Sequence, residues 1–562
     1  MTDPQAPCAL GLDFGTASVR AVVVETQTGA ERGSAVADYA HGVIDVALPG
    51  SGVALGADWA LQHPGDWVVA IEKAVPKALA AAGVRKESVV GVGVDFTACT
   101  VLPVDASGTP LCLLPRWSAR PHAWVKLWKH HASQPQADRI NALAEKRGEA
   151  FLADYGGKTS SEWLAAKALQ ILDEDPEVYD AAAAIVEGGD WIVAQLSGAR
   201  VRNSCGAGYK GFWSRERGFP PREFFGALDP RFAGLPDKLT GEIVPPGRRV
   251  GGLTSSMASR LGLAPGTAVG AAIIDAHSAV PAATVVQPGR MVMVMGTSTC
   301  HMLLDSRHAK VEGVGGVVRD GIVEGFSGYE AGQPAVGDIF GWFAKLVGGA
   351  DPARFEALEA EAAKAPPGGH GLLALDWWNG NRSVLVDANL TGLILGMTLA
   401  TTAGDVYRAL IEATAFSTRR ILDAFAKEKI PVAELIAVGG LAERSPLLLQ
   451  IYADVTGRPI GLAAAVNASA LGAAMLGAVA AGPGKGGHGS FAGAAHAMTR
   501  LKDERVTPDP ERAAAYDVLY GQWLELHDHF GRGTDLMKRL KAVGSGLHIS
   551  AFETPKNEDL TP

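Results

Sequence analysis

Two similar segments decide the fold: Leu-Gly-Leu-Asp-Phe-Gly-Thr-Ala-Ser at residues 10–18 and Met-Val-Met-Val-Met-Gly-Thr-Ser-Thr at residues 291–299. In each, a hydrophobic strand enters a Gly-Thr turn and a second strand leaves it, which predicts a β-hairpin with small hydroxyl residues at its tip. Gly15 and Gly296 lie half the length of the 562-residue chain apart. Gly-Thr is a common dipeptide, so coincidence is one explanation. Two similar lobes that each offer a hairpin to a shared cleft are the other.

The rest of the chain predicts an α/β protein, because short stretches rich in Val, Ile and Ala alternate with longer Ala- and Leu-rich stretches that carry charges at helical spacing. The predicted strands are 8–12, 20–25, 89–95, 267–274, 290–295 and 435–438. The predicted helices are 67–82, 160–172, 191–196, 354–363, 402–427 and 445–456. The lobe boundary is expected near 281–289, and the Gly-rich stretch 482–493 is expected to be a surface loop or a flexible insert.

Composition excludes several classes of protein. A chain of 562 residues exceeds what one hydrophobic core usually carries, so at least two domains are expected. The net charge of −9 argues against a nucleic-acid partner. No apolar run reaches the roughly 18 residues of a membrane span, and the N-terminus lacks the basic start of a secretory signal, so we expect a cytoplasmic protein. The five cysteines, scattered and without a Cys-x-x-Cys pair, are expected to be small buried side chains in a reducing compartment.

The hairpins have the properties of a phosphate site. Glycine lets the backbone approach a ligand, exposed N–H groups point at its oxygens, and hydroxyls add donors. Asp13 could hold Mg²⁺ through water and Arg20 could reach a phosphate. The alternative is an ordinary tight turn in which Asp13 caps backbone N–H groups. The sequence has no P-loop, no Gly-x-Gly-x-x-Gly after a strand, no His-Glu-x-x-His and no Gly-x-Ser-x-Gly, so any nucleotide binds without those devices.

Three further positions could carry chemistry. Asp275 follows an apolar stretch at the carboxyl end of a predicted strand, where it could accept a proton during phosphoryl transfer; a helix N-cap is an equal alternative. Gly439 and Gly440 follow another strand and leave a side-chain-free shelf for a flat ring, or form a plain strand-to-helix turn. Lys210 lies in a Gly-rich stretch, where a lone cation often meets a ligand, although a solvated surface lysine is the commoner case.

Together these motifs resemble, in order and spacing, the FGGY family of carbohydrate kinases, within the actin, sugar kinase and Hsp70 superfamily. A C-terminal family signature is present in full: Gly392-x-Ile394-x-Gly396-Met397, seven residues, then Asp405-Val406-x-x-Ala409-Leu410-Ile411-Glu412. The resemblance extends from about Ala9 to Ala480. Four stretches are similar to the members of the family that act on ribulose: 127–132, 155–163, 330–340 and 375–382.

The resemblance implies two actin-like (ribonuclease H-like) lobes around a central nucleotide and sugar cleft. Residues 1–285 would form the lobe with the sugar site, residues 286–545 the lobe with the adenosine site, and residues 546–562 a tail; fraying is expected from Phe552 to Pro562. It further implies transfer of the γ-phosphoryl group of ATP, with Mg²⁺, to the C5 hydroxyl of a ketopentose, with L-ribulose favoured. Other pentuloses or pentitols, such as D-ribulose, xylulose and ribitol, are the alternatives, and the resemblance also implies a homodimer.

The resemblance assigns roles to individual residues. Asp275 matches the general base and contacts the sugar, and Asp13 matches the carboxylate that organises Mg²⁺. The positions that match phosphate contacts are Gly15, Thr16, Arg20, Gly296 and Thr297. The adenosine shelf is matched by Gly439, Gly440 and Ser445, and the sugar pocket by Lys210, Glu330 and the backbone around Ala98.

The sequence departs from the family pattern at two places, and both argue against glycerol as the substrate. The N-terminal signature, centred on a Lys before a Trp, is only partly present around Lys158 and Trp163. Ala98-Cys99 stands where glycerol kinases have an Arg-Glu pair. A functionally different alternative is a non-catalytic, actin-like nucleotide switch. A filament would not need Asp275, Lys210 and Glu330 around a polyol, and an Hsp70 would need a further domain for which the chain after about residue 500 has no room.

Overall fold

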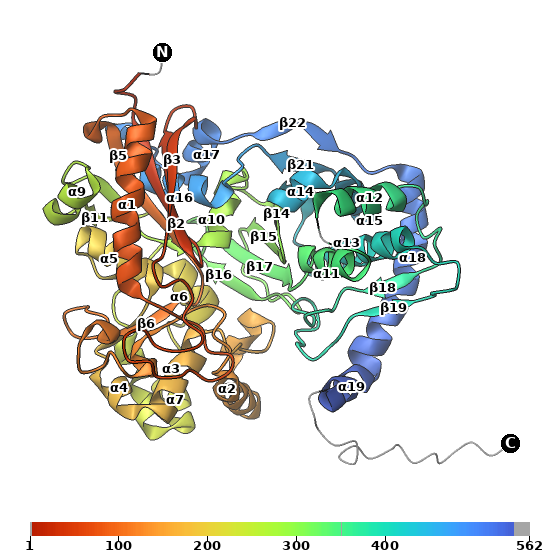
Figure 1. Cartoon of the computed structure of the whole chain (residues 1–562), viewed down its shortest axis with the longest axis horizontal. Coiled ribbons are helices and arrows are strands. Elements are labelled where there is room, and N and C mark those ends of the chain that lie inside the picture. The colour runs from red at the N-terminus through yellow and green to blue at the C-terminus, as the bar shows by residue number, and fades with distance from the viewer. Residues whose placement is uncertain (1–2, 350, 545–562) are drawn as a thin grey trace.

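The computed structural model describes residues 3–349 and 351–544, so the predicted tail 546–562 lies outside the described residues. The chain forms two lobes side by side (Figure 1). The N-terminal lobe is built on a mixed sheet with the strand order β11-β12-β5-β1-β2-β3, and β13 also pairs with β5. These strands are β1 (Cys8–Phe14), β2 (Ser18–Glu25), β3 (Glu31–Asp38), β5 (Val89–Phe96), β11 (Arg249–Gly252), β12 (Ala268–Gly270) and β13 (Ile273–Ile274).

The C-terminal lobe contains a second seven-stranded sheet, ordered β16-β17-β15-β14-β20-β21-β22. Its strands are β14 (Gly289–Met295), β15 (Thr299–Asp305), β16 (Gly316–Arg319), β17 (Ser327–Gln333), β20 (Val432–Val438), β21 (Ile460–Ala463) and β22 (Leu501–Val506). One face packs against α11 (Gly337–Leu346), α12 (Pro352–Ala362), α13 (Ala403–Lys427), α15 (Pro446–Thr456) and α18 (Pro510–Asp528). A two-stranded sheet, β18 (Leu373–Leu375) with β19 (Leu393–Leu395), and α19 (Leu536–Gly544) extend this lobe.

The two sheets repeat one topology. In each, three adjacent strands are antiparallel, a fourth strand pairs parallel with the first, a fifth follows parallel, and an antiparallel strand closes the edge. The C-terminal sheet differs by one additional antiparallel strand, β16, which pairs with β17 at the opposite edge. The hairpin β1–β2 in the first lobe therefore corresponds to β14–β15 in the second. This repetition confirms the predicted fold of two similar lobes, each contributing one Gly-Thr hairpin.

An insertion extends the N-terminal lobe and has its own hydrophobic core. It contains a four-stranded sheet of order β4-β7-β6-β8 and a short parallel pair, β9 with β10. Its strands are β4 (Leu61–Gln62), β6 (Val101–Val104), β7 (Val125–Lys126), β8 (Ala184–Glu187), β9 (Val201–Asn203) and β10 (Glu242–Val244). Its helices include α2 (Gln134–Arg147), α3 (Leu164–Glu174), α4 (Pro176–Ala181), α6 (Ser204–Gly211), α7 (Arg222–Leu228) and α8 (Leu235–Lys238).

Local sequence explains where the predicted helices begin and end. The N-terminal sheet packs against α1 (Pro64–Ala82), α5 (Gly188–Ser197) and α9 (Ser255–Leu261). Pro64 starts α1, and Gly83 ends it with φ of 62°, a left-handed conformation that glycine adopts without strain. Thr402 and Asp405 form a capping box at the start of α13, where each side chain satisfies a backbone N–H of the other. The helices predicted at 402–427 and 445–456 are thus confirmed within one residue.

One predicted strand was wrong in its extent. Residues 267–274 form two short strands, β12 and β13, rather than one. Between them, Ala271 N–H donates to Arg248 O at 2.9 Å and Gly247 N–H donates to Ala271 O at 3.0 Å. The chain leaves β5 at this point to bond the loop before β11, which the apolar sequence does not reveal.

Helix α16 (Ala468–Ala481) lies between β21 and β22 of the C-terminal sheet in sequence but packs on the N-terminal sheet (Figure 1). It contacts β1, β5 and α10 (Asp275–Ala282), and only small residues allow so close an approach. A Cβ atom at Gly91 would lie 1.9 Å from Gly477 O, and one at Gly93 would lie 2.0 Å from Ala473 O. A hydrophobic cluster that includes Val22, Val292 and Met475 joins both sheets through this helix. The lobes therefore share a core.

The Gly-rich stretch 482–493 is a loop with defined contacts. It forms a short 3-10 turn, Pro483–Lys485, and leads into α17 (Phe491–Met498). Thr26 Oγ1 donates to Gly486 O at 2.6 Å, and His488 Nε2 donates to Thr26 O at 2.7 Å. Of the two predicted alternatives, a flexible insert is wrong, because these bonds hold the loop against the turn between β2 and β3.

Two further expectations from composition can be compared with the structure. All five cysteines are free, and Cys8, Cys99, Cys112 and Cys205 are buried. Among the described residues, no helix combines the length and the apolarity that crossing a membrane requires.

Candidate active site

The two Gly-Thr hairpins close in the same way and are both braced from behind. Gly15 N–H donates to Ser18 O at 3.0 Å, and Gly296 N–H donates to Ser298 O at 2.9 Å. Around the first tip, Trp128 Nε1 donates to Thr16 Oγ1 at 3.0 Å and Gln62 Nε2 donates to Thr16 O at 2.7 Å. The first hairpin is therefore positioned by side chains from the insertion.

The second hairpin is braced by the start of α11. Val336 N–H donates to Thr297 O at 2.8 Å, and Gly337 N–H donates to Gly296 O at 3.1 Å. A Cβ at Gly337 would lie 2.5 Å from Gly296 O, so glycine is required there. These bonds engage the carbonyl groups of the tip.

Three carboxyl groups meet where strands of the N-terminal sheet end. Asp13 on β1 is level with Asp95 on the parallel strand β5, and Ile273, two residues before Asp275, is level with Asp95 on the other side. Burial raises the pKa of Asp95 well above its usual range, and the Asp13 and Asp275 charges add to this effect. Burial and these charges therefore favour the protonated form of Asp95. Burial also raises the pKa of Asp13, while the contact with Asp95 and the Arg20 charge oppose the rise.

Asp95 was not among the predicted site residues, although the strand that ends with it was predicted. The sequence signal that could have identified Asp95 is a carboxylate at the end of an apolar strand. The same signal made Asp275 a candidate. Only the parallel register with β1 shows that this carboxyl lies beside Asp13.

Asp275 is the first residue of α10, and Ile274 occupies the N-cap position. The Asp275 carboxylate accepts a hydrogen bond from Ala276 N–H at 2.7 Å. Burial raises the pKa of Asp275 to about 7, helped by the negative charges of Asp13 and Glu330 and opposed by Lys210. A carboxylate with that pKa can take up a proton at neutral pH, which suits a general base.

Lys210 and Glu330 form a buried ion pair between the lobes. Lys210 Nζ on α6 lies 3.1 and 3.0 Å from the two carboxylate oxygens of Glu330 on β17. His277 Nε2 lies 3.3 Å from Glu330 Oε2. Although burial alone would raise it, the Lys210 charge and the His277 contact hold the pKa of Glu330 well below its ordinary value. The alternative of a solvated Lys210 is wrong, since the residue is only 8% exposed.

The remaining predicted residues lie around this pair and the hairpins. Ala98 follows β5 and lines a small internal cavity with Glu187, Gly206 and Ile274. Gly439 has φ of 104°, and a Cβ there would lie 2.5 Å from Met295 O, so the shelf predicted to hold adenosine abuts the second hairpin. Gly440 begins α14 (Gly440–Arg444).

Ser445, at the edge of this predicted shelf, caps a helix and bonds a neighbouring side chain. It caps α15 by accepting a hydrogen bond from Leu448 N–H at 3.3 Å. Its hydroxyl donates to Glu359 Oε1 at 3.0 Å. A contact with adenosine stays a prediction for this residue.

Arg382, in the loop after β18, is a further candidate that was not singled out. Among the described residues it has no hydrogen bond or ion pair, yet its guanidinium faces the charges of Glu162 and Glu330 from opposite lobes. Its Nη1 would lie 3.5 Å from a Cβ at Gly332. Ser383 Oγ accepts a hydrogen bond from Gly332 N–H at 3.1 Å, which fixes this loop to β17. Arg382 thus lies against β17, near Gly332, without a hydrogen-bond or ion-pair partner among the described residues.

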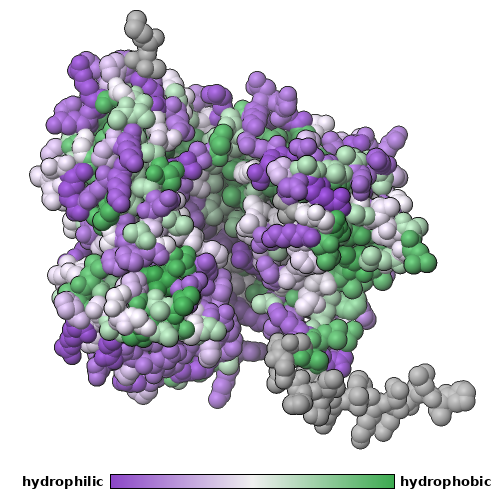
Figure 2. Space-filling model, viewed as in Figure 1, coloured by the Kyte–Doolittle hydropathy of each residue, from purple (hydrophilic) through white to green (hydrophobic). Residues whose placement is uncertain are grey.

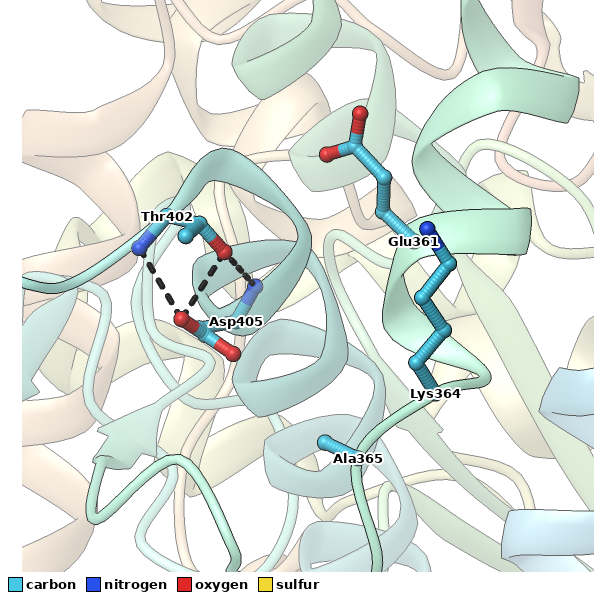
Figure 3. A pocket seen from close by; sticks show the side chains of 5 residues that line it. All are labelled: Glu361, Lys364, Ala365, Thr402 and Asp405. Carbon is cyan, nitrogen blue, oxygen red and sulfur yellow. Dashed lines mark hydrogen bonds between the residues drawn. The ribbon is translucent and has the colours of Figure 1, made fainter.

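A separate hollow of about 590 Å³ lies on the C-terminal lobe (Figure 3). It is lined by Glu361, Lys364, Ala365, Thr402 and Asp405. Thr402 and Asp405 bond each other as the α13 capping box, and none of the predicted site residues lines this hollow. The surface is also hollowed between the two lobes (Figure 2).

The protein has two repeated lobes, and each lobe has a hairpin suited to binding phosphate. Asp275, a carboxylate with a pKa near neutrality, is also part of this site. This combination defines a phosphotransferase of the actin-like fold. Comparison with known proteins makes this class specific. The profile of the FGGY carbohydrate kinase N-terminal domain matches residues 8–281, and that of the C-terminal domain matches residues 291–481. The chain belongs to the FGGY family of carbohydrate kinases.

Named relatives cover nearly the whole chain. A ribulokinase from Halalkalibacterium halodurans is 53% identical over 96% of this chain and 98% of the relative. One from Geobacillus thermodenitrificans is 55% identical over 95% of this chain and 96% of the relative. A xylulose kinase structure from Rhodospirillum rubrum superposes with a TM-score of 0.78 at 24% identity, covering 92% of this chain and 98% of that one. The fold likeness thus extends to kinases of other sugars.

Proposed function

We propose that the chain is an ATP-dependent ribulokinase that phosphorylates the C5 hydroxyl of ribulose, with L-ribulose favoured. The observation that carries the proposal is the Lys210–Glu330 pair, buried between the lobes near Asp275. A polyol needs donors and acceptors at fixed positions, and this pair supplies both. The naming of the relatives as ribulokinases supports the choice of sugar.

In this proposal Asp275 accepts the proton of the attacking hydroxyl. A base of pKa about 7 is ionised in a large share of molecules at neutral pH and still takes up the proton as the oxygen bonds to phosphorus. Gly15, Thr16, Gly296 and Thr297 would hold the phosphates from opposite sides, with Arg20 as a cation. Closure of the lobes on both substrates would exclude water and limit hydrolysis of ATP.

The site also fits a magnesium ion, since Asp13 and Asp275 offer the carboxylate oxygens that this cation prefers. Bound Mg²⁺ would neutralise negative charge on the phosphates during transfer. Asp95 lies level with Asp13 on the adjacent parallel strand. Gly439 and Gly440 would form the floor under adenosine, bounded by Ser445.

The test is release of ADP by the purified protein with MgATP and, in parallel, L-ribulose, D-ribulose, ribitol, D-xylulose and glycerol. We expect strong stimulation by ribulose and the largest kcat/KM with the L isomer. Asp275→Asn, prepared identically, controls for contaminating kinases. Preference for another pentulose or pentitol would correct the substrate, and ATP turnover indifferent to every sugar would favour the nucleotide switch.

We also propose that the protein is a cytoplasmic homodimer without a nucleic-acid partner. The charge of −9 supports the last point. Exposed hydrophobic side chains on the C-terminal lobe support the dimer: Trp342, Leu346, Leu395, Met397 and Leu399. Light scattering after gel filtration tests it, and Leu399→Glu should shift the mass toward one chain. A monomeric wild-type protein would refute the dimer.

A further inference from the structure

Three side chains that the kinase site does not use converge on the N-terminal lobe. His41 lies in the segment after β3, His63 is the N-cap of α1, and Asp66 lies in the first turn of that helix. His41 Nδ1 is 3.0 Å from Asp66 Oδ1, and His63 Nδ1 is 3.6 Å from the same oxygen. One ligand atom from each residue lies within 4.8 Å of the other two.

These spacings match the edges of a metal coordination shell. Bonds of about 2.0–2.1 Å from a tetrahedral Zn²⁺ to its ligands place neighbouring ligand atoms roughly 3.3 Å apart. The separations of 3.0 and 3.6 Å from the carboxylate to the two imidazoles bracket that value. Because the His41 and His63 rings are stacked with 19° between their planes, both rings would have to rotate for their in-plane lone pairs to meet one ion.

The His63 ring is positioned as a ligand would be. Its Nδ1 is shut off from solvent and has no hydrogen-bond partner among the described residues. The ring stacks on His41 with centroids 4.7 Å apart, and the edge of Trp124 packs against it. A Cβ at Gly65 would lie 2.8 Å from the ring, so glycine makes room for it. Burial lowers the pKa of His63, which keeps the nitrogen lone pair available.

The carboxylate is oriented independently of either ring. His41 backbone N–H donates to Asp66 Oδ2 at 2.8 Å, which leaves Oδ1 directed at both imidazoles. His41 Nδ1 now shares its proton with Asp66, and a cation would replace that proton. His41 is also partly exposed, so solvent can reach the site and complete the coordination shell.

We propose that His41, His63 and Asp66 form a binding site for a divalent transition-metal ion of the Zn²⁺ and Co²⁺ type, separate from the Mg²⁺ of the reaction. Two imidazole nitrogens and one carboxylate favour such ions, whereas Mg²⁺ prefers oxygen ligands alone. The proposal does not depend on which sugar the protein phosphorylates.

The site would connect two segments that already hold the first hairpin. Tyr39 N–H, two residues before His41, donates to Ala17 O at 2.9 Å. Gln62, next to His63, donates to Thr16 O at 2.7 Å. A bound ion would fasten these two segments to each other behind the hairpin tip. We therefore expect metal binding to raise the thermal stability of the N-terminal lobe.

The test is titration of the metal-stripped full-length protein with Zn²⁺, followed by calorimetry, and with Co²⁺, followed by its visible absorption. Excess Mg²⁺ is present throughout to occupy sites made of oxygen ligands. We expect one equivalent to bind and the melting temperature to rise. His63→Ala should weaken binding at least about tenfold and abolish the rise, and His41→Gln should weaken binding similarly.

His496→Ala is the matched control, because it removes an exposed histidine on α17 outside the cluster. Melting of each variant without metal shows whether it is folded, and the partly exposed His41 gives a variant that keeps the core intact. Absence of Zn²⁺ binding in the wild type would overturn the proposal. Binding that both cluster variants retain would also overturn it.

Discussion

Replacing Glu330 with Gln should destabilise the protein, because it leaves the Lys210 ammonium buried without a counter-charge. The side chains of Lys210 and Glu330 are only 10% and 11% exposed, and two bonds of 3.0–3.1 Å join them. His277, which is 2% exposed, contacts the same carboxylate. Breaking one partner of such a pair costs about 3–5 kcal/mol. In a lobe of this size that corresponds to a fall in Tm of roughly 6–10 °C.

The pH dependence of this loss follows from the direction of both pKa shifts. The pKa of Glu330 is depressed on folding, so its stabilisation is present above the ordinary value of 4.5 and is lost as pH falls through the folded value. The pKa of Lys210 is raised, so its stabilisation is present below 10.5 and is lost as pH rises through the folded value. The deficit of Glu330→Gln should therefore be constant between these limits and shrink below pH 4.5.

A double-mutant cycle with Lys210→Met, measured by thermal melts without ligands, isolates the pair. Lys210→Met leaves the Glu330 charge buried and should cost a similar amount, whereas the double variant should lose less than the sum because neither charge is stranded. Equal and additive losses would refute the coupling. A Glu330→Gln variant with wild-type Tm at pH 7 would refute the reasoning as a whole.

Three other variants test the catalytic site and the packing. Asp275→Asn should bind both substrates and lose about 10²- to 10⁴-fold in kcat, since the amide cannot take the proton; sugar phosphorylation near the wild-type rate would remove Asp275 from the role of base. Arg382→Ala should raise the sugar KM about 10- to 100-fold, which is the loss expected for a hydrogen bond from a charged donor, and should leave the ATP KM unchanged. The control is Arg319→Ala, which removes an arginine on β16 that donates to Ser306 O. The opposite pattern of KM changes would place Arg382 at the nucleotide. Gly477→Ala should lower the free energy of unfolding by about 1–3 kcal/mol, because the new Cβ would lie 2.9 Å from backbone atoms of Gly91, Val92 and Gly93. Gly484→Ala is the control in the thermal melts, because a Cβ there would have no heavy atom within 4 Å. Stabilisation by Gly477→Ala would contradict the close packing.

Local signals in the sequence were enough to predict the two hairpins, several strands and the ends of α13 and α15. The Gly-Thr turns, Thr402 and Pro446 act on their immediate neighbours, so their effects can be inferred without tertiary structure. Asp95 and Asp275 were equivalent as patterns, each a carboxylate after an apolar strand. The position of Asp95 beside Asp13 depends on parallel pairing between β1 and β5, which no local signal specifies.

Contacts that join distant parts of the chain could not be predicted in the same way. His41 and Asp66 are separated in the sequence by a loop and by β4. Arg382 reaches Gly332 on β17 from a segment with little regular structure. The alanines and glycines of α16 predict a helix, but its amphipathic pattern is weak because both sides are buried. The sequence therefore does not show which sheet α16 covers.

The position of α16 has a consequence for dividing the protein. A fragment that ends near residue 285 would fold around an open groove lined by Gly11, Gly91 and Gly93, because the helix that fills it lies almost two hundred residues further along the chain. Neither half should be soluble when expressed alone. Co-expressed, the two halves should complement each other, since each carries the surface that the other lacks, and recovered kinase activity would report their reassembly.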